Sequence, residues 1–374
     1  MFIPSLSVKI REVRVGVFRV GLEIPDFGSA NDMVVVKVIG EDGSEGIGYV
    51  TDYHHIKEGV YFSDLLAEFI RRIIARFVVG RDTTEYEAIW DELFQRLTRW
   101  GRRGFVIHAI SGVDIAIWDL LAKEANKPLW RLLGGYRSEV TTYANTAHQL
   151  PPKELAAKAL EYVKQGFDAV KIRGSLTAVS PEEATERIKA VREAVGPDVK
   201  LMVDLNGTYD LNLAMRMCRG WEKYELFWIE EPVHPDNLEG YKRLKRVCGI
   251  PIAAGEQHHT IYDFKLLLES EAVDIVQPDV GHVGGITEWL RVWALARAYG
   301  IPVSPHLMPI VSAHLVAAKP GTMWIEYTAP DNPLRSAIFD VFDEPKSIMY
   351  AKNGKVYVPE TPGIGIKLKP QHQF

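Results

Sequence analysis

Ionisable and amide side chains follow a series of short apolar runs along the chain, at the points where strands would end. They are Lys171, Arg173, Asp204, Asn206, Glu230, Glu231, Glu256, Asp279, His306 and Glu326. From one run to the next they recur every 20 to 33 residues, about one strand-and-helix unit. In a parallel barrel the C-terminal strand ends meet at one mouth, so we expect a single site. Carboxylates gathered there would repel one another, which predicts a cation among them.

Three carboxylates, those of Asp204, Glu230 and Glu256, end three consecutive runs. Hard oxygen ligands suit Mg²⁺ better than Zn²⁺, for which proteins favour His and Cys. One such acid alone is more often a helix cap or a solvated loop residue, but three in register favour a metal site. The choice between Glu230 and Glu231 stays open, because alternation along a strand turns only one of them inward.

His306 and Asp279 end neighbouring runs and are expected to lie side by side. A carboxylate that accepts a hydrogen bond from one ring nitrogen fixes the tautomer and raises the basicity of the other nitrogen, which predicts a general base or acid. The alternative is that His306 only caps its strand and Asp279 the next helix. Glu326, on the last run, is placed to hydrogen-bond a substrate oxygen, or to form a structural ion pair.

Lys171 and Arg173 are two residues apart, so their side chains share one face of a strand. A guanidinium stays protonated, which makes Arg173 a poor base and a good clamp for a carboxylate. Lys171 is suited to neutralise a developing oxyanion. Either residue could instead only balance the charge of the acidic rim.

The runs alternate with amphipathic helical patterns, which predicts parallel strands closed into an α/β barrel of the TIM type. A doubly wound open sheet is the competing fold, but no GxGxxG turn follows any strand. The runs are VTTYANT, DAVKIRG, KLMVDLN, LFWIEEP, PIAAGE, VDIVQPD, IPVSPH and TMWIEY.

Ahead of the barrel, period-two alternation over residues 5–22 and 32–50 predicts an antiparallel sheet, with LEIPDFGSAND between them as a polar loop. Helical patterns follow around residues 63–79, 83–98 and 106–125. We therefore expect three parts: an α+β capping domain over 1–130, the barrel over 131–345, and a strand-rich tail over 346–374 that returns to the cap.

Composition excludes several classes of protein. The net charge of −5 disfavours a nucleic-acid partner, and 47% apolar residues in 374 exclude disorder as the main state. No stretch reads as a signal peptide or approaches a membrane span, so no membrane partner is expected. The two cysteines, Cys218 and Cys248, are too few for a disulfide scaffold and lack zinc-ribbon spacing, which favours a reducing cytoplasm.

The sequence resembles the enolase superfamily, in its mandelate racemase/muconate lactonizing enzyme-like branch, over nearly the whole chain. The motifs that carry the resemblance occur in order: KPLWRLLGG, VDLNG, WIEEP, AAGEQ, QPDVGHVGGIT, SPHLMP, MWIEY and PETPGIGI. The resemblance implies a modified (β/α)₇β barrel with a capping domain, and a homo-oligomer.

The resemblance also implies roles for the site residues. Mg²⁺ would be held by Asp204, Glu230 and Glu256, and Asp279 and His306 would form the base dyad. The shared step of the superfamily is removal of the proton α to a carboxylate, which gives an enediolate stabilised by the metal. The resemblance places Glu326 in a hydrogen bond to the substrate carboxylate or to this intermediate.

Three positions depart from patterns common in the branch. Arg173 replaces the second lysine of Lys-x-Lys, so a base on the opposite face is missing. Asp279 stands where cycloisomerases and dipeptide epimerases carry a lysine, and Asn206 replaces a histidine found in some sugar-acid dehydratases.

A single His/Asp dyad suffices to eliminate water from a polyhydroxy acid, so we expect an acid-sugar dehydratase that yields a 2-keto-3-deoxy acid. The alternative is a racemase or epimerase of an α-hydroxy or N-acyl amino acid, with Arg173 or a lid residue serving the second face. A non-enzymatic sugar-acid binding or structural role is less favoured, because a structural protein has no need for a metal triad and a dyad around one rim.

Substrate specificity is expected from the capping segments LEIPDFGSAND and Tyr53 to His55. Tyr53, His55, Asn206 and His258 are the candidates for substrate contact. For His258, as for His282, a surface position is the favoured interpretation.

Overall fold

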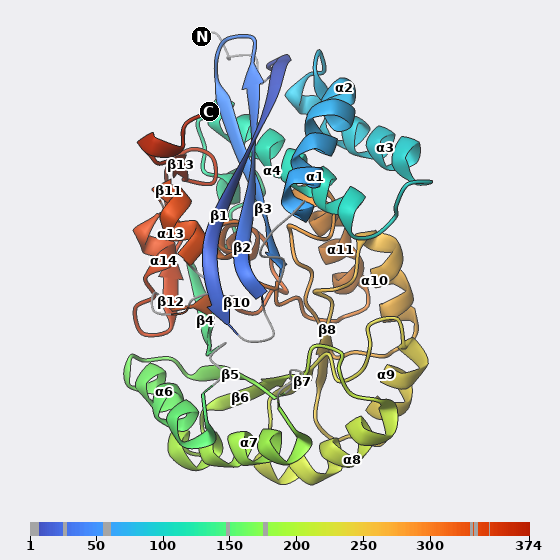
Figure 1. The fold of residues 1–374 in the computed structure, drawn as a ribbon, viewed down its shortest axis with the longest axis vertical. Helices are drawn as coiled ribbons and strands as arrows, with labels where there is room; N and C mark the ends of the chain where they lie inside the picture. The colour runs from blue at the N-terminus through green and yellow to red at the C-terminus, as the bar shows by residue number, and fades with distance from the viewer. Residues whose placement is uncertain are drawn as a thin grey trace.

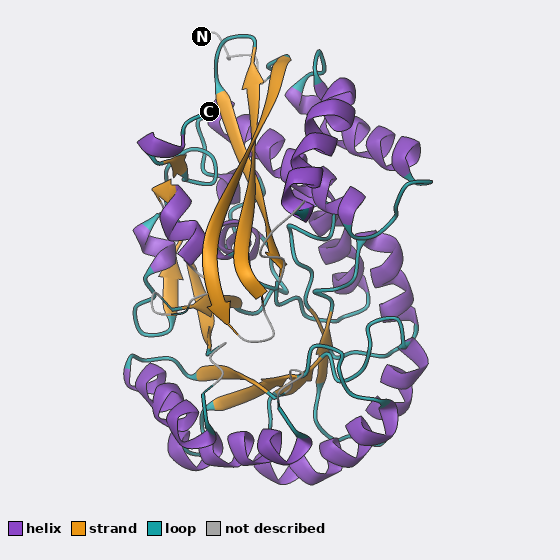
Figure 2. Cartoon of the chain, in the orientation of Figure 1, coloured by secondary structure: helices purple, strands orange, loops and turns teal. Residues whose placement is uncertain are grey.

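The structure, a computed structural model, describes residues 7–24, 28–54, 61–146, 150–174, 179–329, 332, 336–343 and 345–374. An N-terminal cap of three long antiparallel strands and several helices lies against a ring of helices that surrounds short parallel strands (Figures 1 and 2). The C-terminal segment, red in Figure 1, lies beside the strands of the cap.

The parallel sheet has the strand order β10-β4-β5-β6-β7-β8-β9. Bridges from Val303 to Val276 in β9 and to Thr322 ahead of β10 join its two ends. Six strand-and-helix units, from β4 to α11, and a seventh in which the bridging residue Val303 precedes a helix come before the last strand, which confirms the predicted (β/α)₇β barrel. The elements are β4 (Glu139–Asn145), α6 (Pro152–Lys164), β5 (Ala169–Arg173), α7 (Pro181–Val195), β6 (Lys200–Asp204), α8 (Leu211–Trp221), β7 (Trp228–Glu230), α9 (Leu238–Lys245), β8 (Ile252–Ala254), α10 (Thr260–Glu269), β9 (Ile275–Val276), α11 (Gly285–Ala298), α12 (Pro309–Ala318) and β10 (Ile325–Thr328).

Alternation along each strand decides which side chains reach the mouth of the barrel. In β6, Leu201 and Val203 pack outward into the main core, while Met202 belongs to the small cluster inside the barrel. Asp204, two residues after Met202, therefore also points inward. A parallel sheet covered by helices needs apolar residues on both faces, so an acidic residue at the end of such a strand stands out.

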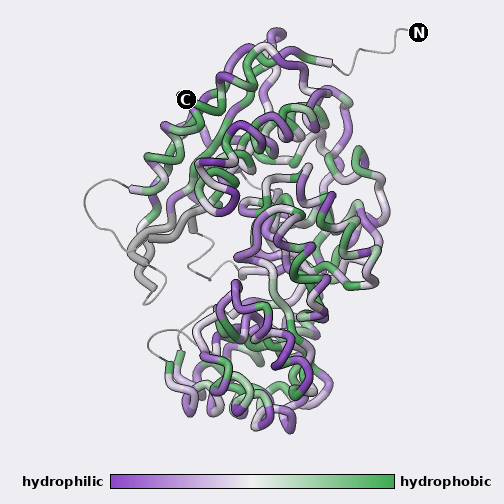
Figure 3. Tube along the Cα trace, turned by 90° about the vertical axis from the view of Figure 1, so that its right-hand side faces the viewer, coloured by the Kyte–Doolittle hydropathy of each residue, from purple (hydrophilic) through white to green (hydrophobic). Residues whose placement is uncertain are grey.

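The barrel helices follow the predicted signals. Ser180 caps α7 by accepting a hydrogen bond from the backbone N–H of Glu183 at 3.1 Å, and Gly196, with φ of 81°, follows its last residue. Along these helices hydrophilic and hydrophobic stretches alternate (Figure 3), as expected of helices with one buried face.

The sheet of the cap extends further than its sequence pattern indicates. Strands β1 (Ile10–Ile24), β2 (Gly28–Gly40) and β3 (Glu45–His54) pair in order. The predicted polar loop LEIPDFGSAND is therefore wrong outside residues 25–27, which lie beyond the described residues, because Gly21 pairs with Ala30 and Ile24 with Gly28. The cap helices are α1 (Phe62–Phe69), α2 (Ala75–Val78) after a π-helical turn, α3 (Tyr86–Leu97), α4 (Phe105–Glu124) and α5 (Leu129–Leu132).

Helix α4 joins the cap to the barrel. By length and composition it could cross a membrane, contrary to the expectation that no stretch approaches that length, but most of it is buried inside the protein. Asp119 accepts hydrogen bonds from the backbone N–H of Ile47 in β3 and of Ile364 in the tail, each at 2.7 Å. Asp114 accepts from the backbone N–H of Thr287 in α11 at 2.9 Å. Buried carboxylates therefore dock α4 on both units.

The C-terminal segment contacts both units. Strand β12 (Lys355–Tyr357) pairs antiparallel with β4, and β11 (Phe342–Asp343) pairs with β13 (Lys367–Leu368). Near the end of the chain, Lys37 Nζ of the cap donates a hydrogen bond to Gln373 Oε1 at 3.0 Å. Helices α13 (Ser336–Val341) and α14 (Lys346–Met349) complete the segment.

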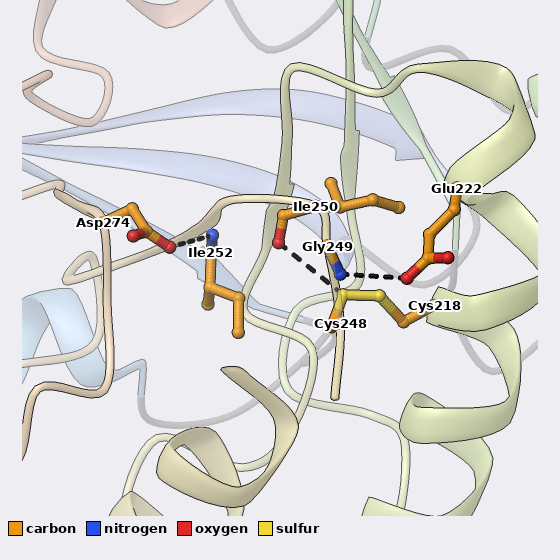
Figure 4. The surroundings of a disulfide bond; sticks show 7 residues. All are labelled: Cys218, Glu222, Cys248, Gly249, Ile250, Ile252 and Asp274. Atoms are coloured by element: carbon orange, nitrogen blue, oxygen red, sulfur yellow. Dashed lines mark hydrogen bonds between the residues drawn. A yellow bond between two sulfur atoms is a disulfide. The ribbon is translucent and has the colours of Figure 1, made fainter. Parts of the chain in front are cut away.

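Cys218 of α8 and Cys248, in the loop before β8, form a disulfide with their Cα atoms 5.8 Å apart (Figure 4). Nearby, Gly249 N–H donates to Glu222 Oε1 at 2.9 Å. The cysteine count gave no indication of this pair, because two cysteines 30 residues apart approach only once α8, β7 and α9 are folded.

Replacing both cysteines by serine should lower the free energy of unfolding. The disulfide closes a loop of 30 residues, for which the chain-entropy relation gives about 3–4 kcal/mol. Urea unfolding of the wild type and of the Cys218→Ser/Cys248→Ser protein, with and without reductant, measures the difference. Reductant should destabilise only the wild type; equal stability of both proteins without reductant would contradict a formed bond.

His314, in α12, is a buried neutral histidine. Its Nδ1 accepts a hydrogen bond from the backbone N–H of Trp130 at 3.2 Å, and its Nε2 lies 3.3 Å from the carbonyl oxygen of Ile364. Burial lowers the pKa of His314 from 6.5 to about 3. A histidine whose pKa is lower in the folded state stabilises the fold above pH 6.5, and that contribution is lost as the pH falls.

Wild-type protein should therefore lose stability between pH 7.5 and pH 5, by about 2 kcal/mol from His314 alone. In His314→Gln the amide can make both hydrogen bonds without titrating, so the loss over this pH range should be smaller by that amount. Urea unfolding at the two pH values tests this. An identical pH dependence in both proteins would show that His314 does not titrate as described.

Candidate active site and metal centre

Three carboxylates converge at the C-terminal mouth of the barrel, as the sequence predicted. Asp204 ends β6, Glu230 ends β7 and Glu256 follows β8. One oxygen of each lies within 4.8 Å of the others. The structure separates the two residues of the doublet: Glu230 belongs to this cluster, whereas Glu231 Oε2 accepts a hydrogen bond from Gln257 Nε2 at 2.6 Å.

The donor set fits a hard divalent cation such as Mg²⁺. Oε2 of Glu256 is buried and accepts no hydrogen bond from the described residues; it faces His306 Nε2 at 3.3 Å, and as an anionic oxygen without a hydrogen bond it suits a bound cation. Burial and the carboxylates of Asp204 and Glu256 raise the pKa of Glu230 to about 8, against the opposing effect of Lys171. Such mutual repulsion is what a bound cation would relieve.

Lys171 lies among the carboxylates and is almost fully buried, with 1% of its surface exposed. Its Nζ is 2.6 Å from Glu230, 3.0 Å from Glu326 and 3.8 Å from Asp204. Burial alone would lower the pKa of Lys171, but Glu230 and Glu326 raise it well above its usual value. The lysine is therefore a fixed positive charge within the acidic cluster.

Arg173 reaches the same cluster from one layer higher on β5. Its Nη1 donates to Asp204 Oδ2 at 2.6 Å and also to Asn206 Oδ1. Asn206 has a φ of 44°, and its Nδ2 lies 3.4 Å from Glu256 Oε1. The guanidinium thus lies on the Asp204 side of the triad, where it can bind an anion but cannot accept a proton.

His306 and Asp279 are in contact, as predicted. Asp279 Oδ2 is 2.8 Å from His306 Nδ1, and Asp279 Oδ1 accepts the backbone N–H of Gly281 at 2.7 Å. The other ring nitrogen of His306, Nε2, therefore faces the triad and lies 3.3 Å from Glu256 Oε2. Burial would lower the pKa of His306, but Glu256, Asp279 and Glu326 raise it to about 10.

Glu326 of β10 lies between the lysine and the imidazole. Its Oε2 accepts the backbone N–H of Leu307 at 3.2 Å and is 3.9 Å from His306 Nε2. Its Oε1 accepts a hydrogen bond from Asn145 Nδ2. Sequence reasoning missed Asn145, although it ends the first barrel strand as the other site residues end theirs.

The structure does not test Tyr53 and His55 as substrate contacts. His55 lies outside the described residues, and Tyr53 is described only as backbone, in β3 opposite Asn31. The surface position favoured for His258 is wrong, because only 5% of this residue is exposed. His282 instead stacks on His108 of α4, with ring centroids 4.3 Å apart.

Comparison with known proteins agrees with this geometry. The family described as "Mandelate racemase / muconate lactonizing enzyme, N-terminal domain" matches residues 25–134, and the family described as "Enolase C-terminal domain-like" matches residues 154–372. An arabinonate dehydratase from Saccharolobus solfataricus is 35% identical over 345 residues, which cover 90% of this chain and 88% of the relative.

Two solved structures share the whole architecture. A racemase from Streptomyces coelicolor A3(2) with bound magnesium superposes with a TM-score of 0.86 at 31% identity, covering 96% of this chain and 97% of the other. An L-talarate dehydratase from Polaromonas sp. JS666, complexed with Mg and L-glucarate, gives a TM-score of 0.84 at 30% identity, covering 97% and 96%.

Proposed function

We propose, since the chain belongs to the enolase superfamily and to its mandelate racemase/muconate lactonizing enzyme branch, that it is a Mg²⁺-dependent sugar-acid dehydratase. The observation that carries the proposal is the approach of an oriented imidazole to a carboxylate triad, with His306 Nε2 3.3 Å from Glu256 Oε2. The similar proteins named as dehydratases of arabinonate and of L-talarate support the same reaction class.

Asp204, Glu230 and Glu256 would hold Mg²⁺, and the described residues supply no second cluster of this kind. A bound Mg²⁺ would attract the carboxylate of the substrate and stabilise negative charge that develops on it. Lys171 and Arg173 would add fixed positive charge beside that carboxylate.

His306 would abstract the proton from the α-carbon through Nε2, because Asp279 occupies Nδ1 and sets the tautomer. Glu256 raises the pKa of His306 more than any other neighbour, and a cation held by that carboxylate would offset this effect and favour the neutral imidazole that a base requires. The electron pair left by the C–H bond forms the enediolate. The imidazolium then donates the same proton to the departing β-hydroxyl, which leaves as water. The enol that remains takes a proton from solvent at carbon 3 and becomes a 2-keto-3-deoxy acid.

Only one face of the substrate would meet a base. Arg173 stands on the Asp204 side of the triad and stays protonated, so it can orient a substrate oxygen without exchanging the α-proton. Glu326, whose pKa is lowered to about 2 by Lys171 and His306 against the effect of burial, stays an acceptor for a substrate hydroxyl.

The experiment is a screen of mono- and diacid sugars with purified protein and Mg²⁺ in D₂O, followed by NMR. Dehydration gives a 2-keto-3-deoxy product with one deuterium at carbon 3. Deuterium at the α-carbon with unchanged elemental composition would instead indicate a racemase or epimerase. No conversion of any acid, with Mg²⁺ bound, would contradict both.

Asn206, Tyr53, His55 and His258 remain proposed substrate contacts, and a homo-oligomer in the cytoplasm remains the proposed state. The Cys218–Cys248 disulfide argues for the opposite compartment, because such bonds are uncommon in reducing cytoplasm. The two compartments are distinguished by alkylating the protein in extracts of its own cells and measuring the mass of the intact chain. Two alkylated cysteines support the cytoplasm, and none supports an oxidising compartment.

A further inference from the structure

Trp228 begins β7, two residues before Glu230, and points into the barrel. It belongs to the interior cluster with Tyr143 and Met202, whereas Ile229 packs outward against the helices. Its exposed fraction is 0%. The indole Nε1 donates a hydrogen bond to Glu230 Oε2 at 3.0 Å.

The two carboxylate oxygens of Glu230 thus have different donors. Lys171 Nζ donates to Oε1 at 2.6 Å, and the Trp228 indole donates to Oε2. The lysine also contacts Glu326 and Asp204, so it acts on the charge of the whole cluster. The indole is neutral and contacts one carboxylate, so it fixes the orientation of that group without reducing the negative charge offered to a cation.

We propose that Trp228 is a positioning residue for the metal centre, holding the Glu230 carboxylate in its ligating orientation through the indole N–H. This inference rests on the proposed Mg²⁺ site. Outer hydrogen bonds to metal ligands commonly contribute about 10–100-fold in metal affinity, and the indole is fully buried in the interior cluster of the barrel.

Removing a buried indole also changes the packing of the core, which could alter metal affinity without any role for the N–H. Trp289 of α11 provides the matched control for this effect. It too is 0% exposed, but its Nε1 has no hydrogen-bond partner among the described residues. Changing either tryptophan to phenylalanine removes the same atoms from a buried position. Only the change at 228 removes a hydrogen bond to a carboxylate of the triad.

The test is the dissociation constant of Mg²⁺, measured by calorimetry on wild type, Trp228→Phe and Trp289→Phe. Trp228→Phe should bind Mg²⁺ about 10–100-fold more weakly, and Trp289→Phe as wild type does. A third protein carries 3-benzothienylalanine at position 228, which keeps the size of the ring and replaces its N–H by sulfur. It should show the same loss as Trp228→Phe.

Wild-type affinity in the benzothienylalanine protein would overturn the role of the N–H, even where Trp228→Phe folds poorly. An equal loss of affinity in Trp289→Phe would overturn it as well, by showing a general effect of core truncation. If wild-type protein binds no measurable Mg²⁺, the proposed metal centre itself is wrong. This outcome differs from failure of the Trp228 proposal, because it is seen in the wild type before any residue is changed.

Discussion

Replacing His306 by asparagine should slow dehydration by at least about 10²–10⁴-fold, the usual contribution of a positioned general base. The amide can still hydrogen-bond Asp279 but cannot take a proton from carbon. Mg²⁺ affinity should stay close to that of wild type, because the triad of Asp204, Glu230 and Glu256 is intact. Turnover and Mg²⁺ calorimetry on the same preparation measure both quantities.

His314→Gln is the control for this experiment, because it removes another buried histidine, one that bonds to Trp130 and Ile364 and not to the triad. It should turn over at the wild-type rate at pH 7.5. A His306→Asn protein that dehydrates its substrate as fast as wild type would remove His306 from the reaction.

Glu256→Gln should abolish the stabilisation of the protein by Mg²⁺. Glu256 lies beside the carboxylates of Asp204 and Glu230, and its Oε2 is 3.3 Å from His306 Nε2. An amide of the same shape removes a ligand to the cation, together with both the repulsion from the carboxylates and the attraction to the imidazole. Wild type should gain about 2.7 kcal/mol at a Mg²⁺ concentration 100 times its dissociation constant, and the variant almost nothing.

The measurement is urea unfolding with and without Mg²⁺. Glu41→Gln is the matched control, since Glu41 is exposed on the turn between β2 and β3, and it should gain as much from Mg²⁺ as wild type does. Equal gains in wild type and Glu256→Gln would place the cation elsewhere.

The barrel and most of its site could be predicted from sequence because a polar residue ends or closely follows each buried apolar run. This pattern located Asp204, Glu256, Asp279 and His306, and the structure brings all four together. Alternation alone could not decide between Glu230 and Glu231. The structure decides, because Glu230 joins the cluster while Glu231 accepts a hydrogen bond from Gln257, a contact with the next strand's loop that no side-chain pattern reveals.

Features that depend on contacts between distant segments were not predictable in the same way. The pairing of Cys218 with Cys248 requires the folded α8–β8 segment. His258 appeared to be a surface residue because polar residues after a strand usually are, but the packed loop buries it. The length of β1 and β2 was missed because Gly, Pro and Asp between them resemble a loop, although the backbone pairs to Gly28.

The central claim is that one divalent cation is shared by three neighbouring strands beside a single imidazole base. Anomalous diffraction from crystals soaked in Mn²⁺, which replaces Mg²⁺ at oxygen-ligand sites, tests it most directly. We predict one strong peak about 2.0–2.3 Å from an oxygen of each of Asp204, Glu230 and Glu256. A peak held by other carboxylates, or no peak among these three, would contradict the claim.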